Sequence, residues 1–143
     1  MIAVSSPGAL RPLHPLHAIL LAFPLPLFLS ALLSDLAYWS TFHVQWANFS
    51  SWLIAGGLLV GAFTLTWALV NLFRRKIGRK GRPIGYFVVL LAMWALGFVN
   101  ALVHATDAWA TMPEGLYLSA ITTLLALVAA WIGYSGFQAG DVR

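Results

Sequence analysis

Residues 51–104 read SWLIAGGLLVGAFTLTWALVNLFRRKIGRKGRPIGYFVVLLAMWALGFVNALVH, two long apolar runs around a short basic segment. The basic segment, RRKIGRKGR, extends from Arg74 to Arg82. Each apolar run has about 20 residues, the length at which a helix crosses the hydrocarbon core of a bilayer. Since backbone polar groups in lipid are satisfied only within helices or closed barrels, we predict that both runs are membrane-spanning helices.

Two further apolar runs flank this stretch, which places four predicted spans near residues 18–38, 51–73, 84–104 and 115–134. The chain is 61% hydrophobic and 8% charged, whereas soluble domains are about 25% charged. The fold class predicted is therefore all-α, a polytopic membrane protein with a single domain over residues 1–143. Because the connections are short, the four transmembrane helices should form an up-down bundle. The chain has no cysteine, which excludes disulfides and thiolate metal sites.

The basic residues fall on one side of this predicted membrane topology. Arg11 precedes the first span, Arg143 ends the chain, and the remaining six lie in the segment from Arg74 to Arg82. The positive-inside rule makes that side, and with it both termini, cytoplasmic. A concentrated basic loop beside a membrane predicts anionic lipid head groups as its partner, and we expect no nucleic-acid partner.

Polar residues near the opposite face form the main candidate site. Asn100, His104 and Asp107 are spaced i, i+4 and i+7 on the third span, so we expect them to share one helical face. Asp35 lies at a similar depth in the first span, and ionisable residues within spans usually face the bundle interior. We therefore expect Asp35 to lie near His104 or Asp107. The alternative is that Asp107 caps a helix end and His104 sits at the water boundary.

A second polar group, His14 and His17, precedes the first span. The structural interpretation is that one imidazole bonds backbone groups and fixes how the chain enters the membrane. The functional interpretation is a proton-responsive or ligand-contacting site beside the basic loop, because histidine titrates near neutral pH. Pro24 and Pro26 predict a kink in the same span, and Asn48 or Ser50 is placed to cap the second one.

Cofactor and metal sites have little support in the sequence. Two axial haem ligands must reach one iron from opposite faces at the same depth. His43 and His104 are the one histidine pair at matching depth, which makes them the haem b candidates, although His43 falls in a loop. A zinc site from these two residues with Asp35 and Asp107 lacks tight ligand spacing. No nucleophile, phosphate-binding or metalloprotease motif occurs, so we expect no catalytic residue, no metal site and no stand-alone enzyme.

Several short motifs together resemble a bacterial membrane-protein family catalogued as domain of unknown function twenty-two thirty-one. They are His14-Pro-Leu-His-Ala-Ile-Leu-Leu-Ala-Phe-Pro24, the acidic Asp35, Gly115-Leu-Tyr-Leu-Ser119 and Trp131-Ile-Gly133. The resemblance covers essentially the whole chain, and the order and spacing of the motifs carry it. The chain departs from the commoner pattern at Ala18, where proline is frequent, and at the end of the second span, which lacks a Gly-x-x-Asp turn.

The resemblance implies a bacterial inner-membrane protein with four spans and no established activity. Some members of the family are fused to or paired with periplasmic redox modules. By analogy only, this implies that the protein is a membrane anchor or electron-transfer partner of a periplasmic oxidoreductase, with haem or quinone near the outer face. The alternative from a different class is a non-redox structural or transport-like membrane protein, whose histidines only tune the helix ends.

The topology can be tested with reporter fusions at Lys80 and at Gly140. Both positions should report the cytoplasm, because every Lys and Arg lies on that side of the predicted membrane. An alkaline phosphatase and fluorescent protein pair gives opposite signals on the two sides. A periplasmic signal at Lys80 would overturn the orientation.

Overall fold

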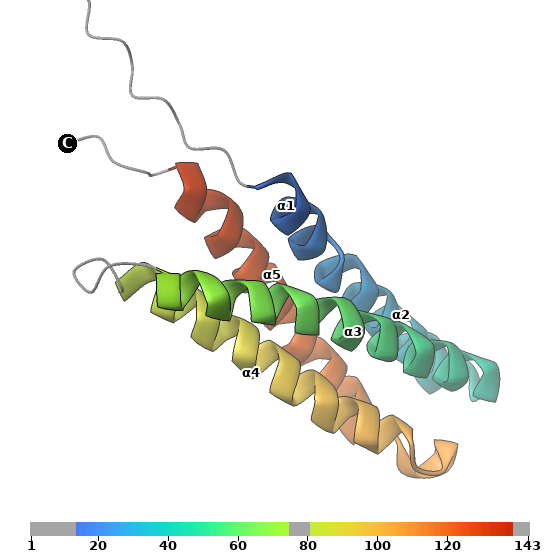
Figure 1. Cartoon of the computed structure of the whole chain (residues 1–143). Coiled ribbons are helices and arrows are strands. Elements are labelled where there is room, and N and C mark those ends of the chain that lie inside the picture. The colour runs from blue at the N-terminus through green and yellow to red at the C-terminus, as the bar shows by residue number, and fades with distance from the viewer. Residues whose placement is uncertain (1–13, 75–80, 139–143) are drawn as a thin grey trace, which may run out of the picture.

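The computed structural model describes residues 14–74 and 81–138, and within them the chain is almost entirely helical (Figure 1). The elements in order are α1 (Pro15–Ala22), α2 (Pro24–Thr41), α3 (Val44–Arg74), α4 (Gly81–His104), the 3-10 helix η2 (Ala108–Ala110) and α5 (Glu114–Gln138). The predictions for Arg11, the centre of the basic segment and Arg143 lie outside the described residues.

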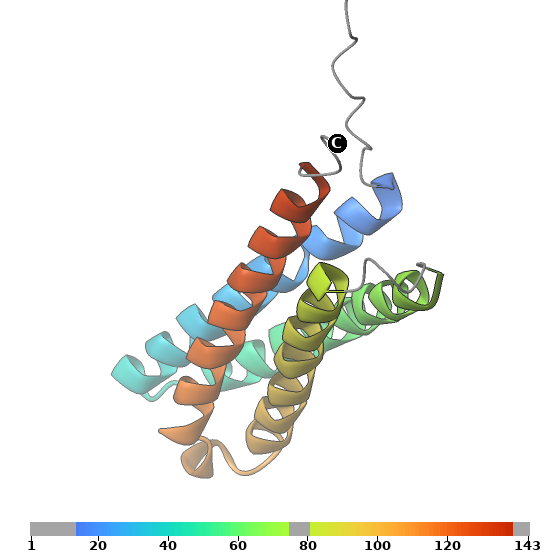
Figure 2. The same ribbon diagram turned by 90° about the vertical axis from the view of Figure 1, so that its left-hand side faces the viewer.

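The helices form an up-down bundle, as predicted (Figures 1 and 2). Both α2 and α4 pack against α3 and α5, so α2 and α4 face each other across the bundle axis. At one end, which we call the terminal end, α1 and α4 begin and α3 and α5 end. At the other, which we call the distal end, short connections join α2 to α3 and α4 to α5.

Four helical segments among the described residues are long and apolar enough to cross a membrane, at Pro15–Thr41, Val44–Arg74, Pro83–His104 and Glu114–Ser135. Each predicted span lies within one of them. The second segment begins at Val44, seven residues before the predicted start. Asn48 and Ser50 therefore lie inside α3, and the prediction that one of them caps this helix is wrong.

The first span is kinked where the sequence places its prolines. α1 ends at Ala22 and α2 begins at Pro24, while Phe23 between them keeps helical angles, φ −80° and ψ −40°. Pro24 has no N–H to donate to the carbonyl of Leu20. The hydroxyl of Thr64 on α3 donates to that carbonyl instead, at 3.0 Å. The break is thus a kink closed by a neighbouring helix, as membrane prolines require.

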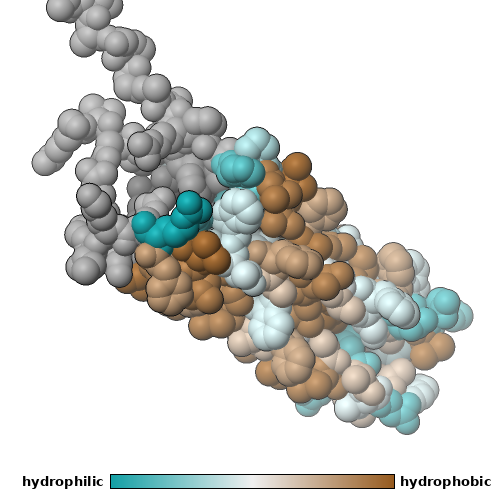
Figure 3. Space-filling model, viewed as in Figure 1, coloured by the Kyte–Doolittle hydropathy of each residue, from teal (hydrophilic) through white to brown (hydrophobic). Residues whose placement is uncertain are grey.

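Each helix turns one heptad-spaced row of residues inward, as in antiparallel bundles. The buried row of α3 is Ala47, Ser50, Ile54, Gly57, Gly61, Thr64 and Ala68, and most of its members are small or polar. Large apolar side chains are exposed on the outward faces and cover the middle of the view in Figure 3, with hydrophilic residues toward the ends. This arrangement suits lipid, where close packing of small residues holds helices together.

Phe28 on α2 fills the centre of the bundle and depends on two glycines opposite it. A Cβ atom at Gly57 on α3 would lie 2.9 Å from the Phe28 ring, and one at Gly97 on α4 would lie 3.3 Å from it. Gly57 thus leaves space for the Phe28 ring. Gly61, one turn later in the same Gly-x-x-x-Gly pattern, does not, because a Cβ atom there would make only ordinary van der Waals contacts with Met93 and Trp94. Phe28 lies two turns before Asp35 on the same face of α2, so this packing helps to set the register of the polar site.

Replacing Gly57 with Ala should destabilise the bundle, because the added methyl group overpacks the Phe28 ring, at a cost of about 1–3 kcal/mol. The matched control is Gly85→Ala on α4, where a Cβ meets no atom within 4 Å. Both substitutions gain the same helix propensity. Thermal unfolding in detergent should show a lower midpoint for Gly57→Ala alone, and equal midpoints would contradict the packing described for Phe28.

Candidate functional site

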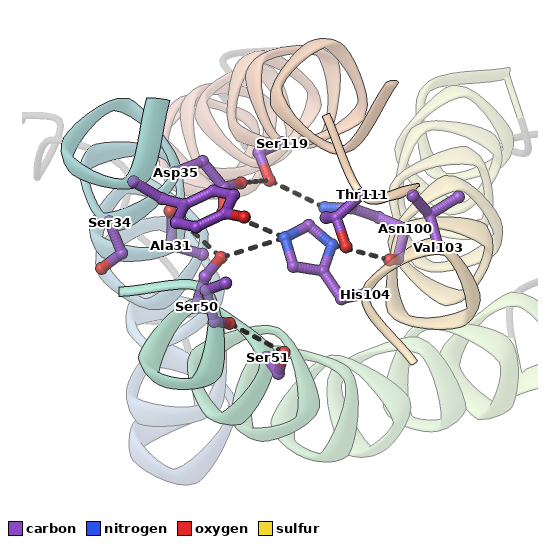
Figure 4. A network of polar contacts seen from close by, with 12 residues as sticks. Ala31, Ser34, Asp35, Ser50, Ser51, Asn100, Val103, His104, Thr111 and Ser119 are labelled. Atoms are coloured by element: carbon purple, nitrogen blue, oxygen red, sulfur yellow. Dashed lines mark hydrogen bonds and ion pairs between the residues drawn. The ribbon is translucent and has the colours of Figure 1, made fainter. Parts of the chain in front are cut away.

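A buried hydrogen-bond partner for Asp35 is the central feature of the distal end. The Oδ1 atom of Asp35 on α2 lies 2.9 Å from Nε2 of His104 on α4. Their side chains are 0% and 1% exposed, respectively. Because α2 and α4 face each other across the bundle, the contact crosses its axis (Figure 4). The prediction that Asp35 lies near His104 or Asp107 is confirmed for His104.

The other oxygen of Asp35 belongs to a chain of hydrogen bonds that returns to α4. The hydroxyl of Ser119 on α5 donates to Oδ2 of Asp35. The Nδ2 group of Asn100 on α4 donates to Oγ of Ser119 at 2.8 Å. Asn100 is fully buried, and its Oδ1 atom has no hydrogen-bond partner among the described residues.

Ser50 is the residue that α3 contributes to the cluster. Its Oγ lies 3.4 Å from Nε2 of His104 and donates to the carbonyl of Ala31 on α2 at 3.2 Å. All four spans therefore send a side chain to one point near the distal end (Figure 4). We call Asp35, Ser50, Asn100, His104 and Ser119 the polar cluster.

Local sequence on α4 and α5 holds the imidazole in place. His104 Nδ1 lies 3.0 Å from the carbonyl oxygen of Asn100, one helical turn earlier. A carbonyl only accepts, so Nδ1 must carry the proton of that bond. Gly115 lets α5 approach, because a Cβ there would lie 2.8 Å from Cε1 of His104 and from Cγ2 of Thr111. His104 is also the last residue of α4, where the helix dipole favours a cation.

The geometry differs from that of a serine hydrolase triad. In a triad, the carboxylate bonds one imidazole nitrogen and the serine bonds the other. Here Asp35 and Ser50 both face Nε2, while Nδ1 is bonded to a backbone carbonyl. His104 therefore has no nitrogen with which to activate a serine while Asp35 orients it, and the cluster gives no support to nucleophilic catalysis.

A turn of the α4–α5 connection packs over the distal side of the cluster. The hydroxyl of Tyr38, one turn beyond Asp35 on α2, donates to the carbonyl of Ala108 in η2 at 3.1 Å. Tyr38 and Thr111 are both buried. Asp107 does not join the cluster, because α4 ends at His104 and the chain turns away. It is exposed, and the prediction that it shares a face with Asn100 and His104 is wrong.

The haem b candidates do not form a fitting ligand pair. His43 is exposed in the connection between α2 and α3. Both nitrogens of His104 already lie within hydrogen-bond distance of other groups, and iron ligation at Nε2 would displace Asp35. Among the described residues no group of three His, Asp or Glu side chains is placed to hold a metal ion. The donor set therefore offers haem no prepared site.

The histidines at the terminal end contact aromatic side chains. His17 is buried, its ring stacks on Trp67 of α3 with centroids 5.8 Å apart, and its Nε2 lies 3.3 Å from the hydroxyl oxygen of Tyr86 on α4. The exposed His14 ring lies 5.2 Å from the same indole. Tyr134 on α5 donates to the carbonyl of Ala18 at 2.9 Å. These contacts join α1 to the other three spans, and the two interpretations of His14 and His17 remain predictions.

Two members of the polar cluster were not identified as site residues from sequence. The sequence suggests a helix cap at Asn48 or Ser50, and it singles out Ser119 only as the last residue of the motif Gly115-Leu-Tyr-Leu-Ser119. The available signal was their position in the inward heptad rows of α3 and α5. A hydroxyl in such a row near the depth of a buried carboxylate is placed to bond it.

Comparison with known proteins agrees with this architecture. A family model described as "Predicted membrane protein (DUF2231)" matches residues 13–137. The chain belongs to this family. The match spans all four apolar helices and every residue of the polar cluster, so the resemblance predicted from the short motifs is confirmed. No curated protein and no solved structure matches the chain. Family membership and the four apolar helices together describe a multi-pass membrane protein, and the family description assigns no activity.

The Asp35–His104 pair can be tested by removing one or both partners. Asp35→Leu or His104→Leu alone should cost about 3–5 kcal/mol of unfolding free energy, because each leaves a buried group without its partner. The double variant should lose clearly less than the sum of the single losses. Asp107→Leu, at an exposed position, is the control and should stay within about 0.5 kcal/mol of wild type. Denaturant unfolding in detergent measures all four variants, and additive single losses would contradict the pairing.

Proposed function

We propose that this protein anchors a periplasmic oxidoreductase to the bacterial inner membrane, with its distal end at the outer face. The positive-inside rule supports this orientation, because every Lys and Arg lies on the terminal side of the predicted topology. In this orientation the segment from Arg74 to Arg82 faces the anionic lipid head groups of the cytoplasmic leaflet. The distal end then meets the periplasm. The observation that carries the proposal is an exposed aromatic pair on the two distal connections.

Phe42 and Trp109 form this pair. Their rings stack with centroids 6.2 Å apart and an interplanar angle of 16°, although the residues are 61% and 76% exposed. Phe42 follows α2 and Trp109 belongs to η2, so both lie beyond the ends of the spans. Large exposed aromatic residues are enriched at the energetically dominant points of protein interfaces. A pair beyond the ends of the spans is placed to contact a protein above the membrane.

The backbone of Phe42 supports a role for its ring. Phe42 has φ 56° and ψ 17°, in the left-handed region. This conformation suits glycine and is rare for a bulky residue. A phenylalanine here costs backbone strain that a glycine would avoid, and the gain is a ring stacked on Trp109. Strain of this kind is concentrated at functional sites, although it does not by itself identify the function.

The same geometry favours an anchor over a haem-carrying electron-transfer partner. Electron transfer through haem would need ligands, and His104 already bonds Asp35 and Asn100 through both nitrogens. The alternative class, a non-redox structural or transport-like protein, is favoured by one observation. The polar cluster connects all four helices, as a purely structural clamp would. In that case the Phe42–Trp109 pair serves only as an aromatic belt at the lipid interface.

A deletion and complementation experiment separates these functions. Dye-linked sugar and alcohol dehydrogenase activities are measured in the membrane and soluble periplasmic fractions of the native bacterium. Deletion of the gene should move one such activity from the membrane to the soluble fraction. Wild type should restore its membrane location, whereas the double variant Phe42→Ala/Trp109→Ala should not, because it lacks the docking pair.

The control for this experiment is Trp131→Ala, which removes an equally exposed tryptophan, 75% exposed, from the side of α5. It should restore membrane binding as wild type does. An unchanged distribution of every activity after deletion would contradict the anchor function. A haem band in the purified protein that is lost in a folded His104→Gln variant would instead establish haem binding at His104 and favour the electron-transfer function.

A further inference from the structure

We propose that Asp35 and His104 form a proton-binding site that holds one proton inside the bundle near the distal end. This inference does not depend on the partner proposed above. It follows from the hydrogen-bond chemistry of the polar cluster, the distribution of charge along the chain and one unpaired buried acceptor.

The first step is the contact between the two side chains. Nδ1 of His104 faces the carbonyl of Asn100 and must be the donor there. In a neutral imidazole with a proton on Nδ1, the Nε2 atom is an acceptor. Ionised Asp35 is also only an acceptor, yet its Oδ1 lies 2.9 Å from Nε2. Two acceptors cannot form this contact, so one further proton must lie between them, on the carboxyl group or on the imidazole.

The second step is the charge balance around Asp35. All eight Lys and Arg residues occur at position 11, between 74 and 82, and at 143. The described positions among these lie at the terminal end of the bundle, far from Asp35. A fully buried carboxylate needs a compensating positive charge or a proton. With no Lys or Arg at this end among the described residues, the proton shared with His104 is what compensates Asp35.

Other titratable side chains near the distal end do not replace that proton. Tyr38 is buried but donates its hydroxyl proton to the carbonyl of Ala108. His43, Asp107, Glu114 and Tyr117 are exposed. On α3 and α5 the groups that face the pair are the hydroxyls of Ser50 and Ser119, which do not ionise. The proton that compensates Asp35 is therefore held by Asp35 and His104 alone among the described residues at the distal end.

The third step is the spare acceptor in the cluster. Oδ1 of Asn100 is buried without a hydrogen-bond partner among the described residues. Rotating the amide would exchange the two ends and leave the amino group unpaired instead, so one polar atom stays unsatisfied in either orientation. A buried acceptor without a donor costs free energy. It belongs to the same chain of hydrogen bonds as Asp35, since the amide of Asn100 donates to Ser119 and Ser119 donates to Asp35. The cluster therefore keeps one uncommitted acceptor in the hydrogen-bond chain of the pair.

The proton keeps the pair neutral wherever it lies. On His104 it gives imidazolium and carboxylate, which the end of α4 favours. On Asp35 it gives a carboxylic acid that donates to Nε2, while Oδ2 still accepts from Ser119. Both forms satisfy every hydrogen bond of the pair. A proton can therefore move between the two side chains without creating a net charge in the membrane interior.

The test counts protons in the folded full-length protein in lipid nanodiscs at neutral pH. Histidine is labelled with ¹⁵N and the aspartate carboxyl with ¹³C, and NMR reports the protonation of each. His104→Gln and Asp35→Asn assign the two signals. The proposal expects one proton on the pair, seen either as imidazolium with carboxylate or as neutral imidazole with carboxylic acid. Neutral imidazole with carboxylate, or imidazolium with carboxylic acid, would overturn it.

The assignment remains available if either variant fails to fold. The chain has only three aspartates, Asp35, Asp107 and Asp141, and four histidines. His14→Gln, His17→Gln and His43→Gln then identify His104 by elimination, as Asp107→Asn and Asp141→Asn identify Asp35. Asp107→Asn is also the matched control. It removes an exposed carboxylate and should leave the Asp35 and His104 signals unchanged. A change of both signals in this folded control would show that the proton count is not confined to the pair, and would also overturn the proposal.

Discussion

A buried carboxylate that must be compensated in lipid is the constraint that organises the distal half of this bundle. Asp35 occupies an inward heptad position between Phe28 and Tyr38, where an apolar residue would ordinarily pack. His104 reaches it from the helix on the opposite side of the bundle axis, and Ser119 bonds its second oxygen. Because one carboxyl group draws partners from opposite and neighbouring helices, the contact specifies how the spans are arranged as well as stabilising them.

The rest of the interior also favours close association of the helices in lipid. Lipid supplies no hydrophobic drive between helices, so close approach and interhelical hydrogen bonds replace it. Glycines at positions 57 and 97 make room for Phe28, and Gly115 makes room for the His104 ring. Thr64 satisfies the carbonyl that Pro24 leaves unbonded. Each of these glycines and Thr64 lies on an inward row, while the large apolar side chains face outward toward the lipid.

At the distal end, exposed aromatic rings lie next to this packed interior. The η2 turn connects the two, since Tyr38 bonds the carbonyl of Ala108 and the next residue, Trp109, stacks on Phe42. A partner that contacted the aromatic pair would therefore lie about two helical turns beyond Asp35 along α2. This proximity joins the two proposals in space, although each stands on separate observations and has its own test.

The sequence by itself determined the spans and the helical class, because apolar length and backbone hydrogen bonding in lipid leave few alternatives. It also indicated that Asp35 would meet His104 or Asp107, since buried ionisable groups seek partners at the same depth, and the structure selected His104. The tertiary structure decided which hydroxyls join them. Ser50 and Ser119 are ordinary small residues until α3 and α5 turn them inward. Asp107 leaves the site because α4 ends three residues earlier. The ring of Phe42, which has a positive φ, stacks on Trp109, 67 positions away in the chain. Such contacts join distant segments, and local residue patterns do not encode them.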